Sequence, residues 1–331
     1  MLAFFLASPE QAAAAGDIRV VTGSTMGTTY AVKLLQSDDT LDMGALESAI
    51  DARLERINAQ MSTWRPDSEL SRFNASTSPD WFAVSTDTVR VVEAARAVSV
   101  LSGGAFDVTV GGVVNLWGFG PGGGDARTPS AREIETAMTA TGYRQLESRA
   151  SPPALRKGRP QMYVDLSAIA KGFAVDALAR LLDARQVRSY LVEIGGELRA
   201  RGAKPDGSPW KVGIERPLPD AQSVQSVIAL RDAAIATSGD YRNYRERDGR
   251  RYSHTIDPRT GRPIAHALAS VSIIAGSAMR ADALATAVMV MGPEQGWRLV
   301  EREGLAAQLI VRSERGFRVL ATPAFETYLV R

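Results

Sequence analysis

The sequence predicts an α+β fold in which mixed or antiparallel sheets pack against helices. Segments with the two-residue period of strands and segments with the 3.6-residue period of helices both occur throughout the chain. They do not alternate strictly, as they would in a doubly wound parallel sheet. Because no internal repeat or low-complexity linker divides the chain, we expect residues 17–331 to form a single domain.

The composition is typical of a soluble globular protein and excludes several kinds of site. The chain has 331 residues, of which 45% are hydrophobic and 23% charged, with a formal net charge of +2. This near balance gives no reason to expect a nucleic-acid partner. No cysteine is present, which excludes disulfides and thiolate chemistry. The two histidines are too few for a multi-histidine metal centre.

The first 16 residues resemble the end of a secretory signal peptide. The apolar run Leu2 to Ala7 is followed by small residues, Gln11 to Gly16, that offer a cleavage site, although the usual positive start is missing. We therefore expect a leader or signal-peptide remnant at 1–16 and a periplasmic protein; a disordered cytoplasmic leader is the alternative. A lipoprotein anchor would need a cysteine, and no apolar run approaches the roughly 20 residues of a membrane span.

The chain should open with a β-hairpin and an amphipathic helix. Residues 18–35 have the pattern of two strands joined by a tight turn over 23–28. Apolar residues then recur at positions 46, 50, 54, 57 and 61, which predicts one buried helix face. Residues 61–74 are interpreted as a polar loop. It carries Trp64, which could line a ligand site or equally pack in the core.

A glycine-rich segment, residues 103–112, follows a helix predicted over 86–101. Glycines at this density let backbone approach a ligand closely. They do not form the strand–GxGxxG–helix unit of a dinucleotide fold, so the segment alone is equally well explained as a flexible loop. We expect a surface excursion over 122–129 and a helix over 131–141.

The second half of the chain is predicted to supply most of the strands. Residues 163–172 have the pattern of a strand that breaks into a helix ending near 182, with Asp165 at the strand end, where ligands collect in α/β proteins. Further strands are predicted at 189–194, 210–214, 224–230, 233–237 and 268–275. A helix over 294–303 and a hairpin over 307–312 and 317–321 should close the chain.

The segment from Ser277 to Gly292 predicts a strong helix with two polar residues inside it. Ser277 suits the N-cap, and Gly292 followed by Pro293 suits the stop. Asp282 and Thr286 are four residues apart and lie on one face. Two hard oxygens at that spacing suit Mg²⁺ or Ca²⁺, but from the pair alone a structural role, with Thr286 bonding to the helix backbone, is the better explanation.

Taken together, nine blocks in order give the chain a resemblance to the ApbE family of FAD:protein FMN transferases, from about Val20 to the C-terminus. The blocks are GSTMGTTY, MSTWRPDSELSRFN, GGAFDVTVG, NLWGFGP, DLSAIAKGFAVD, VEIGGEL, ATSGDYRNY, SHTIDPRTGRPI and ADALAT. The resemblance implies a T-fold-like α+β protein that binds FAD and Mg²⁺. It further implies cleavage of the FAD pyrophosphate, transfer of FMN to a Thr or Ser of an acceptor protein, and release of AMP.

The resemblance also implies roles for individual residues. The residues at FAD-contacting positions are Met26, Trp64, Ala105, Phe106, Asp107, Asp165, Lys171 and Ile256. Asp282, which would also be catalytic, and Thr286 match magnesium ligands, and the carbonyl of Ala168 matches a main-chain ligand. His254 matches the proposed general base, a role in which a histidine contributes roughly 10²–10⁴-fold.

Two positions depart from the pattern of some relatives, which have Glu in place of Lys171 and an acid in place of Ala285. We therefore expect fewer side-chain ligands around the metal, with water or phosphate oxygens completing its shell. By resemblance, the acceptors are FMN-carrying subunits of redox complexes such as Rnf, the sodium-pumping NADH:quinone reductase or the nitrous-oxide-reduction regulator. Two alternatives share these motifs: an FAD pyrophosphatase that gives FMN and AMP, and a non-catalytic FAD-binding protein.

Overall fold

The computed structural model describes residues 17–36, 41–121, 127–218, 223–241, 244–247 and 250–330. The expected leader at 1–16 and part of the excursion at 122–129 lie outside these ranges. The helices found in the described residues are α1 (Met43–Met61), α2 (Glu69–Ala75), α3 (Thr86–Leu101), α4 (Gly111–Leu116), α5 (Ala131–Met138), α6 (Ala170–Ala184), α7 (Ala278–Arg302) and α8 (Pro323–Glu326).

Within the described residues, the main sheet has eight strands in the order β1-β2-β6-β7-β10-β15-β16-β17. Every neighbouring pair in it is antiparallel, which confirms the predicted α+β class. Its strands are β1 (Asp17–Thr25), β2 (Thr28–Gln36), β6 (Tyr190–Ile194), β7 (Glu197–Arg201), β10 (Ala234–Gly239), β15 (Leu268–Ala275), β16 (Ala306–Ser313) and β17 (Gly316–Ala321).

The other strands form one three-stranded sheet, β3-β5-β4, and the pairs β8–β9, β11–β12 and β13–β14. They are β3 (Phe82–Ala83), β4 (Leu146–Ala150), β5 (Pro153–Lys157), β8 (Trp210–Glu215), β9 (Val224–Leu230), β11 (Tyr244–Arg247), β12 (Arg250–Ser253), β13 (Ile256–Asp257) and β14 (Arg262–Pro263). The hairpins β4–β5 and β11–β12 were not predicted from the sequence.

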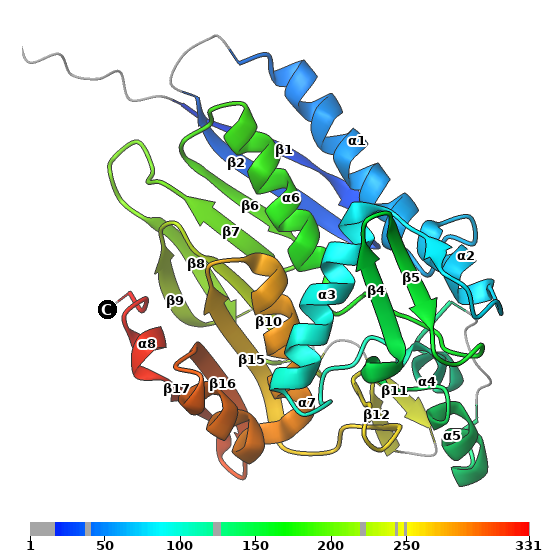
Figure 1. The fold of residues 1–331 in the computed structure, drawn as a ribbon. Coiled ribbons are helices and arrows are strands. Elements are labelled where there is room, and N and C mark those ends of the chain that lie inside the picture. Colours follow the sequence, from blue (N-terminus) through cyan, green and yellow to red (C-terminus); the bar gives the residue numbers. More distant parts are fainter. Residues whose placement is uncertain are drawn as a thin grey trace, which may run out of the picture.

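Both faces of the main sheet are covered, because its strands alternate apolar side chains between two cores. On β6, Tyr190 and Val192 belong to the larger core and Leu191 to the smaller one. Helices α1, α3, α6 and α7 pack over the larger core, and Figure 1 shows α6 and α7 lying across the same face of the sheet. The β8–β9 hairpin and α8 contribute to the smaller core on the other face.

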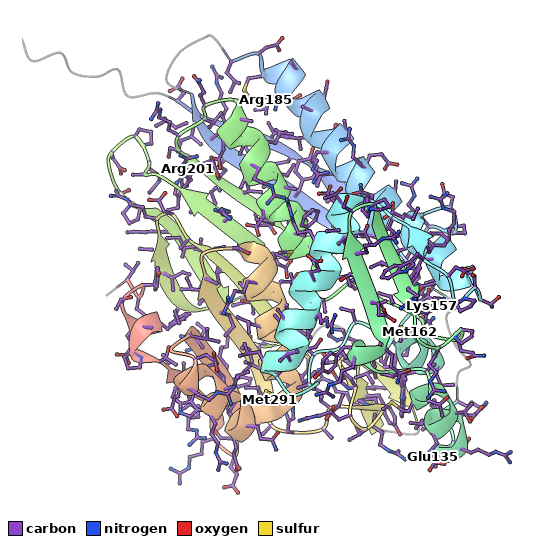
Figure 2. The ribbon with its side chains drawn as sticks, in the orientation of Figure 1. Glu135, Lys157, Met162, Arg185, Arg201 and Met291 are labelled. Carbon is purple, nitrogen blue, oxygen red and sulfur yellow. The ribbon has the colours of Figure 1, made fainter. Side chains whose placement is uncertain are left out.

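The segment predicted as a polar loop over 61–74 contains a helix, α2, so this prediction was wrong for its second half. Ser68 caps the helix by accepting a hydrogen bond from the Ser71 amide at 2.9 Å. At the other end Lys157, labelled in Figure 2, donates from Nζ to the carbonyls of Asn74 (2.8 Å) and Ser76 (2.9 Å). A residue far along the chain therefore completes this helix.

The strand predicted to begin at Tyr163 and end at Asp165 is also wrong, because only an isolated bridge joins Tyr163 to Val110 in the described residues. The backbone here is extended, but a side chain takes the place of a neighbouring strand. Asn74 donates to the Val164 carbonyl and accepts from the Val164 amide, each at 2.8 Å. Asp165 therefore follows a side-chain-bridged segment rather than a sheet strand.

Helix α7 confirms the predicted start at Ser277, whose side chain accepts from the Arg280 amide. The predicted stop at Gly292 is a kink, with φ 79° and ψ −178°, between two helical segments that run on to Arg302. Such a positive φ favours glycine, and Pro293 suits the first position of the second segment because it lacks an amide hydrogen. The first segment carries both polar residues of interest.

Candidate active site

A cavity of about 1060 Å³ lies where the β6–β7 turn, the start of β2 and the end of β10 meet α7. Segments from most of the chain line it, so the fold gathers residues that are distant in sequence. Of the predicted site residues, those that line this cavity are Trp64, Ala105, Phe106, Asp107, Asp165, Ala168, Lys171, His254, Ile256, Asp282 and Thr286.

Met26 is the predicted site residue that does not line the cavity in this structure. It lies in the β1–β2 turn with a φ of 51°, beside Gly27 at 72°, and packs partly against the larger core. Thr28 and Thr29, which follow it, do line the cavity. The turn is thus next to the cavity, although the Met26 side chain contributes to the core.

Asp282 lies at the base of the cavity, on the first segment of α7. Its side chain is buried, and Oδ2 accepts a hydrogen bond from the Gly172 amide, in the first turn of α6, at 3.0 Å. That amide is one of those left without a partner at a helix start. Burial raises the pKa of Asp282, and the attraction of Lys171 and the bond from Gly172 offset only part of this effect.

Glu197, the first residue of β7, is a second buried carboxylate at the same end, and only 2% of its side chain is exposed. Its Oε1 pairs with Nζ of Lys171 at 2.6 Å. Burial and then repulsion by Asp282 raise the pKa of Glu197, and the attraction of Lys171 offsets part of this rise. Burial alone would lower the pKa of Lys171, but the attraction of Glu197 and Asp282 outweighs it and raises that pKa. The positive charge of Lys171 therefore interacts with both buried acids, Glu197 and Asp282.

Glu197 was not singled out from the sequence. The one available signal was its place in the block VEIGGEL, directly after the tight turn at Gly195 and Gly196. These two glycines have φ values of 59° and 101°. An acid that opens a strand after such a turn carries no periodic or metal-ligand pattern, so only the structure shows that it is buried close enough to Asp282 to be repelled by it.

The donors at this end suit a hard cation. Thr286 Oγ1 lies 3.1 Å from Oγ of Ser238 on β10, and Thr286, Asp282 and Ala168 all line the cavity. Oxygen ligands in small number, with open space for ligand oxygens, are what Mg²⁺ prefers. Within the described ranges no three Asp, Glu or His side chains gather as a metal-binding group. A cation here would combine side-chain and main-chain oxygens.

Asp107 uses its oxygens to shape the glycine-rich segment. Oδ1 accepts from the Thr109 amide (2.8 Å) and hydroxyl (2.6 Å), and Oδ2 accepts from the Tyr143 amide at 2.8 Å. Burial raises the pKa of Asp107, and these hydrogen bonds partly oppose the rise. At this predicted FAD-contacting position, the carboxylate is therefore already hydrogen-bonded within the protein. These bonds also hold the adjacent residues Ala105 and Phe106 in place.

Another part of the cavity wall is formed by loops and aromatic rings. Trp64 is 65% exposed, so the alternative that it packs in the core is wrong. His254, between β12 and β13, lies edge-to-face with Phe119 at a centroid distance of 6.4 Å. The Arg245 guanidinium lies over the same ring, 5.6 Å from its centroid, and donates to the Gly118 carbonyl.

Asp165 also lines the cavity. Its Oδ1 accepts from the amide (2.9 Å) and hydroxyl (2.5 Å) of Ser167, and its own amide donates to the Val108 carbonyl at 2.7 Å. The last bond ties the Asp165 loop to the glycine-rich segment. This part of the cavity wall is thus a hydrogen-bonded unit.

The fold and the cavity define a class: an α+β protein with a large cavity whose wall combines oxygen ligands, buried charged groups and aromatic rings. Such a cavity suits a long ligand with a phosphorylated part and a flat aromatic part. The chain belongs to the ApbE family, whose family model matches residues 26–309.

Named relatives agree with this membership over nearly the whole chain. A Vibrio cholerae protein named FAD:protein FMN transferase is 48% identical over 309 residues, which cover 93% of this chain and 92% of the relative. An Escherichia coli K12 protein of the same name is 40% identical over 318 residues, covering 96% and 90%.

Solved structures show the same fold. The flavin transferase ApbE from Vibrio cholerae superposes with a TM-score of 0.88 at 46% identity, covering 95% of this chain and 100% of that one. The apo form of the Pseudomonas stutzeri flavinyl transferase ApbE gives a TM-score of 0.86 at 45% identity, covering 95% and 97%.

Proposed function

We propose that this chain is an FAD:protein FMN transferase. The observation that carries the proposal is family membership along almost the whole chain, together with a cavity lined by eleven of the residues expected at the site. In the reaction, a Thr or Ser hydroxyl of an acceptor protein attacks the FMN phosphorus of FAD. The new O–P bond forms, the pyrophosphate bond breaks, and AMP leaves with the bridging oxygen.

The buried end of the cavity would receive the pyrophosphate. Asp282, Thr286 and the Ala168 carbonyl would hold Mg²⁺, which when bound neutralises charge on the phosphates and on the leaving AMP. Lys171 supplies a positive charge to the same end, where it attracts phosphate oxygens. Helix α7 and the hydrogen bond between Ser238 and Thr286 hold the two metal-ligand side chains in place, so little rearrangement is needed when the ligand arrives.

The aromatic end would receive the flavin and the acceptor. Trp64, largely exposed at the cavity wall, offers a flat face for an isoalloxazine ring. His254 would accept the proton of the attacking hydroxyl, because an imidazole titrates near neutral pH. Its position between β12 and β13, against Phe119, keeps the imidazole on the cavity wall.

The compartment, the acceptor and the domain organisation are further proposals. Residues 1–16, which resemble a signal-peptide remnant, support a periplasmic location. The family resemblance supports acceptors of the Rnf, sodium-pumping NADH:quinone reductase or nitrous-oxide-reduction regulator type. Continuity of the main sheet from β1 to β17 supports one domain over 17–331. Within the described ranges, no helix has the length and apolar character needed to cross a membrane.

The test incubates the protein with FAD, Mg²⁺ and a candidate acceptor subunit, then denatures the mixture. We expect flavin fluorescence to stay with the acceptor band and AMP to appear in equal amount. Replacing the acceptor Thr or Ser with Ala should abolish the labelling. FMN and AMP released at the same rate without any acceptor would instead identify a pyrophosphatase. FAD that stays intact with every acceptor would identify a binding protein.

A further inference from the structure

Among the residues that the structure describes, one buried carboxylate oxygen of Glu197 has no partner. Oε1 is paired with Lys171, but Oε2 is inaccessible to solvent and accepts no hydrogen bond from these residues. A buried acceptor in this state is unfavourable, because it has lost its water and gained nothing in return. Glu197 also lines the cavity beside Asp282. The oxygen therefore marks an unfilled interaction at the phosphate end of the site.

An ion pair with a purely structural role looks different in the same protein. Asp176 on α6 accepts from the Ala278 and Met279 amides and from Arg199, so both of its oxygens are used. Glu197 has one partner for two oxygens, and that partner, Lys171, is 31% exposed and reaches into the cavity. The comparison indicates that, within the described part of the chain, Oε2 of Glu197 lacks a partner, which could be a cation or a hydrogen-bond donor.

We propose that Glu197 is a second carboxylate of the divalent-cation site, and that Lys171 holds the place of the cation until the cation binds. Binding would release Lys171 from Glu197 and free its ammonium group for the ligand phosphates. This inference rests on the cation site of the proposed function. It also accounts for Ala285, the position on α7 where some relatives have an acid. Here Glu197 on β7 would take the place of that acid.

The local backbone allows Lys171 to lie close to Glu197. A Cβ atom at Gly195 would come within 2.8 Å of Thr28 Cγ2 and 3.4 Å of Lys171 Cδ, so the glycine leaves room for the lysine stem. Glu193, an acid on β6 near the same turn, makes a different contact. Its Oε1 accepts from the Gly196 amide at 2.7 Å and closes the turn. Glu193 is therefore a matched control of equal charge.

The test measures binding of Mn²⁺, used as a probe for the cation, by electron paramagnetic resonance on the full chain, with and without ADP. We expect E197Q to weaken Mn²⁺ binding at least tenfold. K171M should instead tighten it several-fold, because the competing ammonium is gone. E193Q should stay within about twofold of wild type. The opposite signs of the first two variants distinguish displacement from a general loss of structure.

Three results would overturn the proposal: unchanged Mn²⁺ affinity in E197Q, weaker binding in K171M, or no Mn²⁺ binding by the wild-type protein in either condition. Thermal unfolding with a chelator checks that each variant folds. If E197Q does not fold, E197D, which keeps the charge but shortens the side chain, should weaken binding by a smaller factor. Because no acceptor is used, failure of FMN transfer with this binding pattern intact would contradict only the proposed function.

Discussion

Two buried aspartates join helices α6 and α7, and they differ in how fully their oxygens are used. Asp176, on α6, accepts hydrogen bonds from the amides of Ala278 (3.1 Å) and Met279 (3.0 Å) at the start of α7. It also pairs with Arg199 at 2.6 Å. Both oxygens of this carboxylate therefore have partners within the protein, as expected of a structural group.

Asp282, on α7, makes the reciprocal contact by accepting from Gly172 at the start of α6. Around it, however, lie a lysine shared with Glu197 and the open cavity. Asp176 is satisfied by the fold alone, whereas the Asp282 end still lacks positive charge. Because both aspartates are buried, burial does not distinguish them; Asp282 differs in having an open cavity and a lysine shared with Glu197 beside it.

The largest expected effect is on catalysis. Asp282→Asn keeps the size of the side chain and an acceptor for the Gly172 amide, but removes the charge that would hold the cation. We expect FMN transfer to fall about 10³-fold, equivalent to roughly 4 kcal/mol. The ion-free protein should change in stability by less than about 1 kcal/mol, since a costly buried charge is removed. Single-turnover labelling of the acceptor and urea unfolding with a chelator measure the two quantities.

A variant that labels its acceptor within tenfold of the wild-type rate would show that Asp282 is structural, like Asp176. The comparison between the two aspartates would then lose its basis.

The second-largest effect is expected from a substitution of Gly172, the glycine at which α6 contacts α7. It should disturb the hydrogen bonds of both aspartates. A Cβ at Gly172 would lie 2.4 Å from the Ala278 carbonyl oxygen and 2.8 Å from Met279 Cα, both backbone atoms that cannot turn away. We expect Gly172→Ala to destabilise the protein by about 3 kcal/mol in urea unfolding, since the helices must separate. Gly276→Ala is the control, because nothing lies within 4 Å of its Cβ; equal losses in both variants would contradict this explanation.

Asp176→Asn should reverse the pattern of Asp282→Asn. The change weakens two hydrogen bonds at the start of α7 and the pair with Arg199, so we expect a loss of about 2 kcal/mol in stability. The loss is limited because the Arg199 side chain is 30% exposed and can be solvated. The folded variant should transfer FMN within a few-fold of wild type. Full stability combined with a large loss of transfer would place Asp176 in the active site.

Some features of the fold and the site could be predicted from the sequence, and others could not. The buried face of α1 and the bounds of β9 and β15 were confirmed, because each is set by a strong local pattern. The four-residue spacing of Asp282 and Thr286 also sufficed to put them on one face of a helix. Local patterns of this kind are independent of the rest of the fold.

Features that depend on distant contacts were missed. Helix α2 is closed by Lys157, and the extended segment at Val164 is bridged by Asn74 instead of a strand. Glu197 becomes buried only because β7 pairs in the sheet beneath α7. Nor could spacing distinguish Asp176 from Asp282, since the partners that satisfy one of them come from another helix and a strand.

The smallest expected effect refines the comparison at Thr286. Ser238 Oγ, 3.1 Å away, orients the threonine hydroxyl, as the start of α6 orients Asp282. Ser238→Ala should therefore raise the Mg²⁺ concentration needed for half-maximal transfer about three- to tenfold, roughly 1 kcal/mol, because one hydrogen bond to a ligand side chain is lost. The maximal rate at saturating Mg²⁺ should change little. Thr237→Ala is the matched control, since Thr237 bonds to Ser272 at 2.8 Å in the sheet and not to Thr286. If both variants respond alike to Mg²⁺, the hydrogen bond between Ser238 and Thr286 does not prepare Thr286 for the cation. Ser238 would then belong with Asp176 to the structural part of the molecule.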